Sequence, residues 1–280
     1  MDHGLLPEKK LCEKCGKECR IDMRRKAFRC EKMSAQGKKG KKKCNFFQSL
    51  YKGTWLEKSN VDFETNMRFV NLFMQDFFSY KVAKNELTLT DKTICDWASF
   101  CREVLVAWCV SQEGKIGGVG EIVEIDESKF GRRKYNVGRV IEGQWVFGGL
   151  CRNTRECFVV PVENRNRETL LAIIKDRIVP GTTVISDCWK AYDCLESEGF
   201  QHLTVNHSLN FVDPETAAHT NTIERQWREL KRRVPMFGRR KHHFVGYLAT
   251  AMFKMRFPEV NKRFHVFITQ AAKLYPPPSP

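Results

Sequence analysis

Three acidic residues, Asp126, Asp187 and Glu224, have the types and positions to do metal-dependent chemistry. Asp126 ends the apolar run Ile-Val-Glu-Ile-Asp, and Asp187 ends the run Thr-Val-Ile-Ser-Asp just before a helical pattern. Glu224 lies within the helical pattern of residues 219–233. Carboxylates that converge on one edge of a sheet can hold two divalent cations for phosphoryl transfer. Mg²⁺ (or Mn²⁺) is the expected ion, because Mg²⁺ binds through few carboxylates and keeps several waters.

The two aspartates also have structural interpretations. Glu124 shares the strand face of Asp126 by the period of two, whereas Glu127 points the other way. Either glutamate is a rival to Asp126 as a metal ligand, or a salt-bridge partner. Asp187, or Ser186 before it, is also a suitable cap for the helix expected after it.

Glu224 and its neighbours have alternatives of the same kind. Glu224 and Arg228 are four residues apart, the spacing of a weak surface ion pair on a helix. His219 and Asn221 are candidates to position the scissile phosphate or a metal-bound water, unless Thr220 or Asn221 only caps the helix. Three apolar residues recur at helical spacing and are expected in the core: Ile223, Trp227 and Leu230.

The net charge of +15 is concentrated at the two ends of the chain. Residues 1–58 carry 17 Lys/Arg and 7 Asp/Glu, and residues 225–280 carry 13 and 2, whereas the stretch between them carries 18 and 24. Clustered basic groups favour a nucleic-acid partner, because they release counterions from its phosphates. The residues expected to contact the phosphate backbone are Lys38, Lys39, Lys41, Lys42, Lys43, Lys129, Arg132, Arg133, Arg225, Arg228, Lys231, Arg232 and Arg233.

The cysteines near the N-terminus predict a structural zinc site. Cys12 and Cys15 form a Cys-x-x-Cys pair, the spacing of a zinc knuckle, and Cys30 with Cys44 is the best second pair. Cys19 is an alternative to Cys30 or Cys44. The chain has no apolar run long enough for a membrane helix and no secretory-type N-terminus, so an intracellular protein is expected, nuclear if eukaryotic and cytoplasmic if bacterial. The 12 cysteines are then reduced or metal-bound.

The stretch after the cysteines is helical by its spacing. Residues 61–80 carry an apolar stripe expected to be buried. Residues 87–110 contain two helix-start signals, Thr88 and then Thr90 or Asp91, which indicate a short helix, a polar turn and a second helix. This pattern favours a helix-turn-helix with Lys92 and Thr93 facing the DNA, and an ordinary helical hairpin is the alternative.

The elements that must position the carboxylates begin at about residue 120. Strands are expected over 120–126, 138–150, 155–162, 182–187 and 202–208. Helices are expected over 164–178, with Asn166 as its cap, over 188–199, closed by Gly199, and over 219–233. The order β-β-β-α-β-α-β-α is that of a ribonuclease-H-like α/β fold with a mixed sheet, whose first strand is central and whose fourth lies beside it. Asp126 and Asp187 are therefore expected at adjacent positions, where the last helix brings Glu224.

These patterns divide the chain into four parts. A basic cysteine-rich, zinc-ribbon-like module covers 1–58 and a helical, helix-turn-helix-like segment covers 59–113. The catalytic domain covers 114–265, and a Pro-rich tail covers 266–280.

Residues 120–257 also resemble the DDE transposase domain of the ISXO2/IS1016 (IS1595-like) group and its eukaryotic Merlin relatives. The resemblance rests on EIDESKFGRRKYNVGR, ISDCWKAY and HTNTIERQWRELKRR, which carry the motifs of that domain in order. It implies that Asp126, Asp187 and Glu224 are the catalytic triad and hold two Mg²⁺ (or Mn²⁺). It also implies cleavage and strand transfer of double-stranded DNA at terminal inverted repeats by a dimer or larger oligomer. The long interval between Cys30 and Cys44 departs from the family's pattern.

Two other functions are compatible with the same residues. One is a DNA-binding protein derived from a transposase that no longer transposes, and the other is a structure-selective nuclease of the same fold. Terminal inverted repeats beside the gene would favour the transposase, and cleavage of branched DNA without strand transfer would favour the nuclease.

Overall fold

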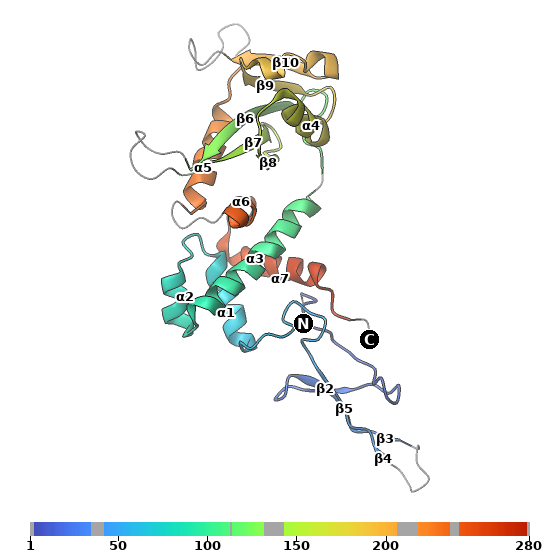
Figure 1. The fold of residues 1–280 in the computed structure, drawn as a ribbon. Coiled ribbons are helices and arrows are strands. Elements are labelled where there is room, and N and C mark those ends of the chain that lie inside the picture. Colours follow the sequence, from blue (N-terminus) through green and yellow to red (C-terminus); the bar gives the residue numbers. More distant parts are fainter. Residues whose placement is uncertain are drawn as a thin grey trace. The chain divides into compact units, whose positions relative to one another are not determined.

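The computed structural model describes residues 3–34, 42–112, 114–131, 143–205, 218–235 and 241–278. The chain forms two compact units (Figure 1). Unit 1 is Met1–Val110 with Phe253–Pro280, and unit 2 is Ser111–Met252. The second boundary falls within helix α6 (Phe244–Arg256), so unit 2 ends before the residue 265 expected for the catalytic domain. Among the described residues, no helix is long and apolar enough to span a membrane.

The sheet of unit 2 has the strand order β10-β9-β6-β7-β8. Strands β6 (Ile122–Phe130), β7 (Gln144–Cys151) and β8 (Cys157–Val162) form an antiparallel meander. Strand β9 (Thr183–Asp187) pairs in parallel with β6, and β10 (Gln201–Val205) pairs in parallel with β9. The first strand of the unit is therefore central and the fourth lies beside it. The predicted ribonuclease-H-like fold with a mixed sheet is confirmed.

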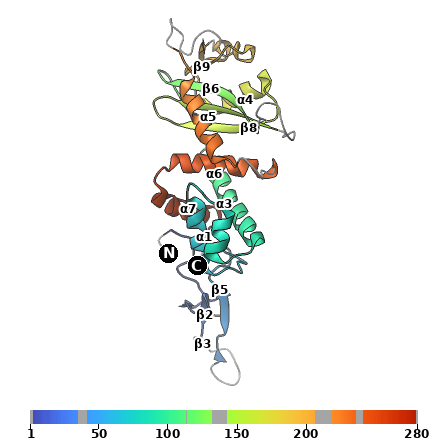
Figure 2. The same ribbon diagram turned by 90° about the vertical axis from the view of Figure 1, so that its left-hand side faces the viewer.

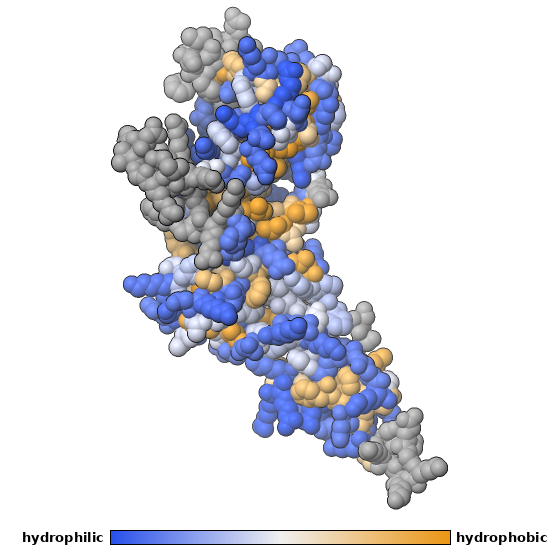
Figure 3. Space-filling model, viewed as in Figure 1, coloured by the Kyte–Doolittle hydropathy of each residue, from blue (hydrophilic) through white to orange (hydrophobic). Residues whose placement is uncertain are grey.

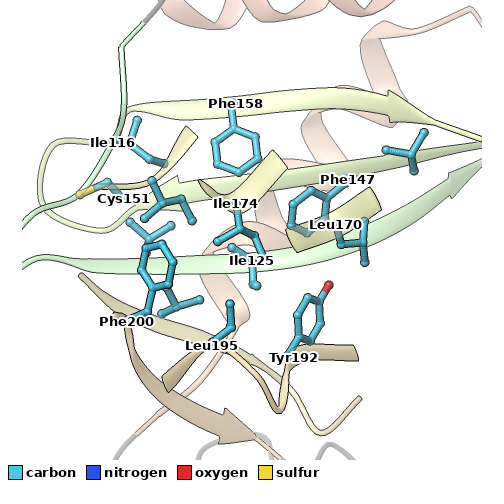
Figure 4. Packing of buried hydrophobic residues seen from close by; sticks show 14 residues of the cluster. Ile116, Ile125, Phe147, Cys151, Phe158, Leu170, Ile174, Tyr192, Leu195 and Phe200 are labelled. Atoms are coloured by element: carbon cyan, nitrogen blue, oxygen red, sulfur yellow. The ribbon is translucent and has the colours of Figure 1, made fainter. Parts of the chain in front are cut away.

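One helix covers each face of this sheet (Figures 1 and 2). Helix α4 (Arg167–Arg177) packs Leu170 and Ile174 against Ile125 of β6 and Phe147 of β7 (Figure 4). These strand residues are odd-numbered and share one face, because successive strand side chains alternate. Helix α5 (Asn221–Arg233) lies on the other face, against β6 and β7. The surface of unit 2 seen in Figure 3 is largely hydrophilic, as expected when these layers enclose the apolar side chains.

Of the two helices predicted between the strands β8 and β10, the structure confirms the first and not the second. Asn166 caps α4 as predicted, and its side chain accepts the N–H of Thr169 at 3.0 Å. The helix expected over 188–199 is wrong: two short 3₁₀ turns, Lys190–Tyr192 and Glu196–Glu198, stand there. The buried residues Tyr192 and Leu195 are three apart, the repeat of a 3₁₀ turn.

Unit 1 begins with small antiparallel strands around the cysteines. Strands β1 (Arg20–Asp22), β2 (Ala27–Cys30) and β5 (Phe46–Ser49) form one sheet, and β3 (Met33–Ser34) pairs with β4 (Lys42–Lys43). Phe28, Phe46 and Leu50 pack against four buried cysteines, Cys12, Cys19, Cys30 and Cys44. The apolar core of this module is therefore small.

The rest of unit 1 is helical. Helices α1 (Phe63–Met74), α2 (Tyr80–Leu87) and α3 (Asp91–Ser111) match the expected helical middle, with a polar turn between α2 and α3. Thr90 caps α3 by accepting the N–H of Thr93 at 3.2 Å. The start signal at Thr88 is wrong, because Thr88 ends α2 in a left-handed conformation with a φ of 55°.

The expected tail over 266–280 is only partly correct. Helix α7 runs from Val260 to Leu274 and buries Phe267, Ile268 and Ala271. These apolar residues recur at helical spacing, and Phe267 packs against Trp55, with 5.5 Å between ring centroids. Only the residues beyond this helix remain as a Pro-rich end.

Candidate active site and cysteine cluster

Asp126 and Asp187 lie at the same level on neighbouring strands. The parallel ladder between β6 and β9 includes Glu124 opposite Ile185. Asp126 lies two residues after Glu124, and Asp187 lies two residues after Ile185. Asp126 therefore lies on the same sheet face as Glu124, and Asp187 on the same face as Ile185. This face is the one on the α5 side, and we call the part of the sheet that carries the two aspartates the carboxylate edge.

Helix α5 brings Glu224 to the same face of the sheet. Trp227, one turn further along α5, is buried, and its indole Nε1 donates to Oδ2 of Asp126 at 2.9 Å. Gly148 of β7 lies opposite Asp126 and leaves room for the indole, since a Cβ there would lie 2.7 Å from the Trp227 ring. Glu224 and Trp227 are three residues apart and so lie on one side of the helix.

Glu124 holds the start of α5. Its carboxylate is fully buried, and Oε2 accepts the backbone N–H groups of Thr222 at 2.9 Å and Ile223 at 2.8 Å. A negative group satisfies the unpaired N–H groups at a helix N-terminus and interacts favourably with the helix dipole. Oε1 pairs with Nε of Arg152 at 2.6 Å, and another Arg152 nitrogen donates to the carbonyl of His219 at 2.6 Å. Glu124 thus fixes the helix that carries Glu224.

The two residues expected beside Glu224 occupy different positions. Nδ1 of His219 lies 3.6 Å from Oε1 of Glu124, so this ring faces the buried carboxylate. Asn221 is the first residue of α5 and is exposed. Thr220, the N-cap residue, makes no side-chain capping hydrogen bond, because Glu124 accepts the N–H groups instead.

The three candidate carboxylates interact electrostatically. Burial, with the nearby carboxylates of Asp187 and Glu224, raises the pKa of Asp126 to about 6, although the hydrogen bonds from the Glu127 amide and the Trp227 indole lower it. Like charges at a partly buried site destabilise one another, and a divalent cation between them removes that cost. Carboxylate oxygens are ligands that Mg²⁺ and Mn²⁺ prefer, but among the described residues these three side chains do not form a group close enough to hold one ion as they stand.

Glu127 faces the opposite side of the sheet. The hydroxyl of Tyr192 donates to its Oε1, and Arg165 lies 3.8 Å from its Oε2. Burial, with the charges of Asp126 and Asp187, raises the pKa of Glu127 to about 8, although Arg165 lowers it. Glu127 is therefore a hydrogen-bonded structural acid on the α4 face and is separated from the α5 face by β6.

Asp187 combines its edge position with a local turn. One of its carboxylate oxygens accepts the N–H of Trp189 at 3.2 Å. This contact lies just before the 3₁₀ turn Lys190–Tyr192. The prediction that Asp187 caps the following element is therefore correct in part, while its side chain stays at the carboxylate edge.

The basic residues predicted to contact phosphate fall into groups. Five lie outside the described residues: Lys38, Lys39, Lys41, Arg132 and Arg133. Lys42 belongs to β4, and the neighbouring Lys43 is exposed and lies 3.7 Å from Glu31. On α5, Arg232 and Arg233 pair with Glu229, while Arg225 and Arg228 are exposed.

Lys129 and Lys231 each lie near an aromatic ring, on opposite faces of the sheet. Nζ of Lys129 lies 5.5 Å from the ring centroid of Trp145, and Nζ of Lys231 lies 5.6 Å from that of Phe130. Partial desolvation lowers the pKa of Lys231, whereas the carboxylate of Asp126 raises it. Lys231 is thus close enough to Asp126 to feel its charge.

Four cysteines of unit 1 converge on one point. The sulfurs of Cys12, Cys15, Cys30 and Cys44 all lie within 4.8 Å of one another, and the Cys12–Cys44 and Cys15–Cys30 pairs are each 3.5 Å apart. Four thiolates around Zn²⁺ lie about 3.8 Å apart, given a Zn–S distance of about 2.3 Å, so the cluster fits this ion. Cys19 is buried nearby and is not part of the group.

Sequence reasoning missed how the site is assembled. It treated Glu124 only as a rival ligand or ion-pair partner and Trp227 only as a core residue, and it gave Arg152 no role. The one local signal was the pair of acidic residues, Glu124 and Asp126, on a single strand face. Their partners on α5 are about a hundred positions away and could not be read from the strand itself.

The strand order defines a ribonuclease-H-like domain. The sequence model of the ISXO2-like transposase domain matches residues 118–256. An uncharacterized transposase-like protein of Haemophilus influenzae is 31% identical over 110 residues, which cover 39% of this chain and 88% of that protein. The chain belongs to the ISXO2-like (IS1595-like) transposase family.

Two solved structures were also found as similar. The catalytic core domain of BIV integrase has a TM-score of 0.32 and 13% identity, over 48% of this chain and 82% of that one. The HTLV-2 integrase catalytic core domain in complex with magnesium (trimeric form) has a TM-score of 0.28 and 10% identity, over 54% and 83%. The fold class rests on the strand order and the family, not on these low scores.

Proposed function

We propose that this chain is a DDE transposase that cleaves double-stranded DNA at terminal inverted repeats and transfers the freed strand to a target. The observation that carries the proposal is that the charges of Asp187 and Glu224 act on Asp126 on a ribonuclease-H-like sheet, which supports these three residues as the catalytic acids. Their mutual repulsion favours bound cations, and the basic charge of the chain favours a polyanionic substrate.

In this proposal, Asp126, Asp187 and Glu224 hold two Mg²⁺ or Mn²⁺. When bound, these ions would activate the attacking oxygen and stabilise the leaving one. Trp227 keeps one oxygen of Asp126 in place through its indole N–H, and Glu124 keeps the start of α5, and hence Glu224, in place. Lys231, which interacts with Asp126, is placed to contact a phosphate held there.

The reaction has two in-line displacements. Water first attacks a phosphodiester at the element boundary, so that a P–O bond breaks and a 3′-hydroxyl is released. That hydroxyl then attacks a target phosphodiester and displaces a 3′ oxygen of the target strand. The enzyme forms no covalent intermediate in either step.

The cysteine cluster and the helices of unit 1 serve DNA recognition in the same proposal. Cys12, Cys15, Cys30 and Cys44 hold one structural Zn²⁺, supported by the spacing of their sulfurs. The α2–turn–α3 pair acts as a helix-turn-helix, supported by the exposed position of Lys92 at the start of α3. Binding two DNA ends together requires a homodimer or larger oligomer.

The test is cleavage and strand transfer on a duplex that carries the DNA flanking the gene, with added Mg²⁺ or Mn²⁺. Asp126→Asn, Asp187→Asn and Glu224→Gln should each lower the rate by about 100-fold or more, because each removes a charge that stabilises the transition state. Binding to the uncut duplex should change little. Asp176→Asn, an exposed acid of α4, is the matched control and should retain full activity.

Three results would contradict this assignment or narrow it. Equal cleavage by wild type and the three variants would show that these carboxylates are not catalytic. Cleavage of branched DNA without strand transfer would instead indicate a structure-selective nuclease. Binding without any cleavage would indicate a DNA-binding protein that no longer transposes.

A further inference from the structure

A second group of side chains lies on the α4 face of the unit 2 sheet and has no role in the chemistry above. The guanidinium carbon of Arg165 lies 3.8 Å from the ring centroid of Trp145 and 5.2 Å from that of Trp189. Both indoles are only partly buried, and 40% of the Arg165 side chain is exposed. Lys129 lies 5.5 Å from the Trp145 ring and is exposed.

This group adjoins the carboxylate edge. Trp189 follows Asp187 by two residues, and its backbone N–H donates to the Asp187 carboxylate at 3.2 Å. Arg165 lies 3.8 Å from Glu127, the residue next to Asp126 on β6. Trp189 thus connects the two, because its backbone N–H contacts Asp187 while its ring lies 5.2 Å from the Arg165 guanidinium carbon on the α4 face.

The chemistry of the group is that of a stacking surface. Aromatic rings and guanidinium planes stack on nucleobases of any sequence, and adjacent Lys or Arg groups pair with the phosphates. Trp145 holds Arg165 by cation–π contact, which leaves the exposed part of the guanidinium for a further planar group. A base inside a duplex has both faces covered by its neighbours, so only an unpaired base can use such a surface.

We propose that Trp189 and Arg165 stack on an unpaired base next to the phosphate at the carboxylate edge, with Lys129 on a neighbouring phosphate. The ligand is a short single-stranded segment at the end of a DNA duplex. This inference rests on the proposed DNA function for its ligand, and it requires no cleavage.

The experiment measures binding by the full-length protein with no Mg²⁺ or Mn²⁺ added. Fluorescence anisotropy gives the Kd for a duplex with a three-nucleotide 3′ extension and for a blunt duplex with the same number of phosphates, at one fixed salt concentration. Wild type should prefer the extended duplex. Trp189→Leu should bind the extended duplex roughly 5- to 150-fold more weakly, the loss expected for one stacked base. Its affinity for the blunt duplex should stay within about twofold.

Two further variants separate stacking from charge and from folding. Trp189→Phe retains an aromatic face and should keep most of the preference. Arg165→Lys retains the positive charge and loses the planar group, so the preference should fall although the charge is unchanged. Circular dichroism melts of each variant identify any loss of fold.

The outcomes are distinct from those of the cleavage test. If Trp189→Leu and Arg165→Lys bind the extended duplex as wild type does, or weaken both duplexes equally, the stacking site is wrong even if the protein cleaves DNA. If the preference depends on Trp189 and Arg165 while wild type cuts nothing, the stacking site stands and the transposase activity does not.

Discussion

At the scale of single residues, alternation along β6 separates three neighbouring acids into different tasks. Glu124 and Asp126 face α5, where Glu124 binds the helix start and Asp126 lies at the carboxylate edge. Glu127 faces α4 and accepts a hydrogen bond from Tyr192. Composition alone could not distinguish these three acids, because they differ in the face of the sheet to which each side chain points.

The first prediction concerns Glu127→Gln and pH. Burial, with two nearby carboxylates, raises the pKa of Glu127 from 4.5 to about 8 in the folded protein. A raised folded pKa gives stability that is complete below about pH 4.5 and is lost as the pH rises through about 8. Glutamine mimics the protonated acid, so the variant should match wild type at pH 5 and be more stable at pH 9.

Urea denaturation at both pH values, without divalent cations, measures this difference. Glu156→Gln changes an exposed glutamate of the same unit and should leave the pH dependence as it is in wild type. A Glu127→Gln protein that loses stability between pH 5 and 9 as steeply as wild type would show that Glu127 is ionised throughout.

At the scale of elements, α5 is fixed to the sheet at two points of β6. Glu124 accepts two N–H groups of its first turn, and Asp126 accepts the Trp227 indole N–H one turn later. Gly148 provides the space for that indole. The position of Glu224 between these two points is therefore set by β6 rather than by the loop before the helix.

The second prediction concerns Glu124→Gln. The change breaks a buried ion pair and leaves the Arg152 guanidinium without its carboxylate, so unfolding should cost about 3 kcal/mol less free energy. Glu229→Gln is the matched control on α5, because it breaks surface pairs worth about 1 kcal/mol or less. Urea denaturation measures both.

A double variant tests the cause. Glu124→Gln combined with Arg152→Met removes both charges, so its loss should be smaller than the sum of the two single losses. Simple additivity would show that Glu124 and Arg152 are not coupled and that the capping role alone accounts for the effect.

The elements themselves were largely predictable from the sequence, and the contacts between them were not. Strand runs bounded by Gly and Pro, together with the Asn166 cap, give the order of elements, and the order gives the central position of β6. The partners of Glu124 are 98 and 99 positions away in the sequence, so no local pattern indicates that it caps α5. The stretch 188–199 was predicted as one helix because composition does not separate a 3.6-residue repeat from two 3₁₀ turns with buried residues three apart.

At the scale of the whole molecule, unit 1 joins segments from both ends of the chain. Arg263 of α7 is buried and donates to Asp76 at 2.8 Å and to the carbonyl of Met74 at 3.1 Å. The cysteine module has few apolar residues of its own, with Phe28, Phe46 and Leu50 around the four sulfurs. A module this small takes much of its folding free energy from a bound metal ion.

The last prediction is that the cysteine module depends on Zn²⁺ and that the unit 2 sheet does not. Cys44→Ser should reduce zinc from one ion per chain to nearly none and remove hydrogen-exchange protection from β2 and β5, while β6 and β9 stay protected. Cys19→Ser is the matched control, because Cys19 is buried beside the cluster but lies outside the group of four. Zinc analysis and hydrogen exchange with mass spectrometry give both readings. Loss of zinc in Cys19→Ser with retention in Cys44→Ser would reverse the ligand assignment, and loss of protection in β6 would show that the metal stabilises more than its own module.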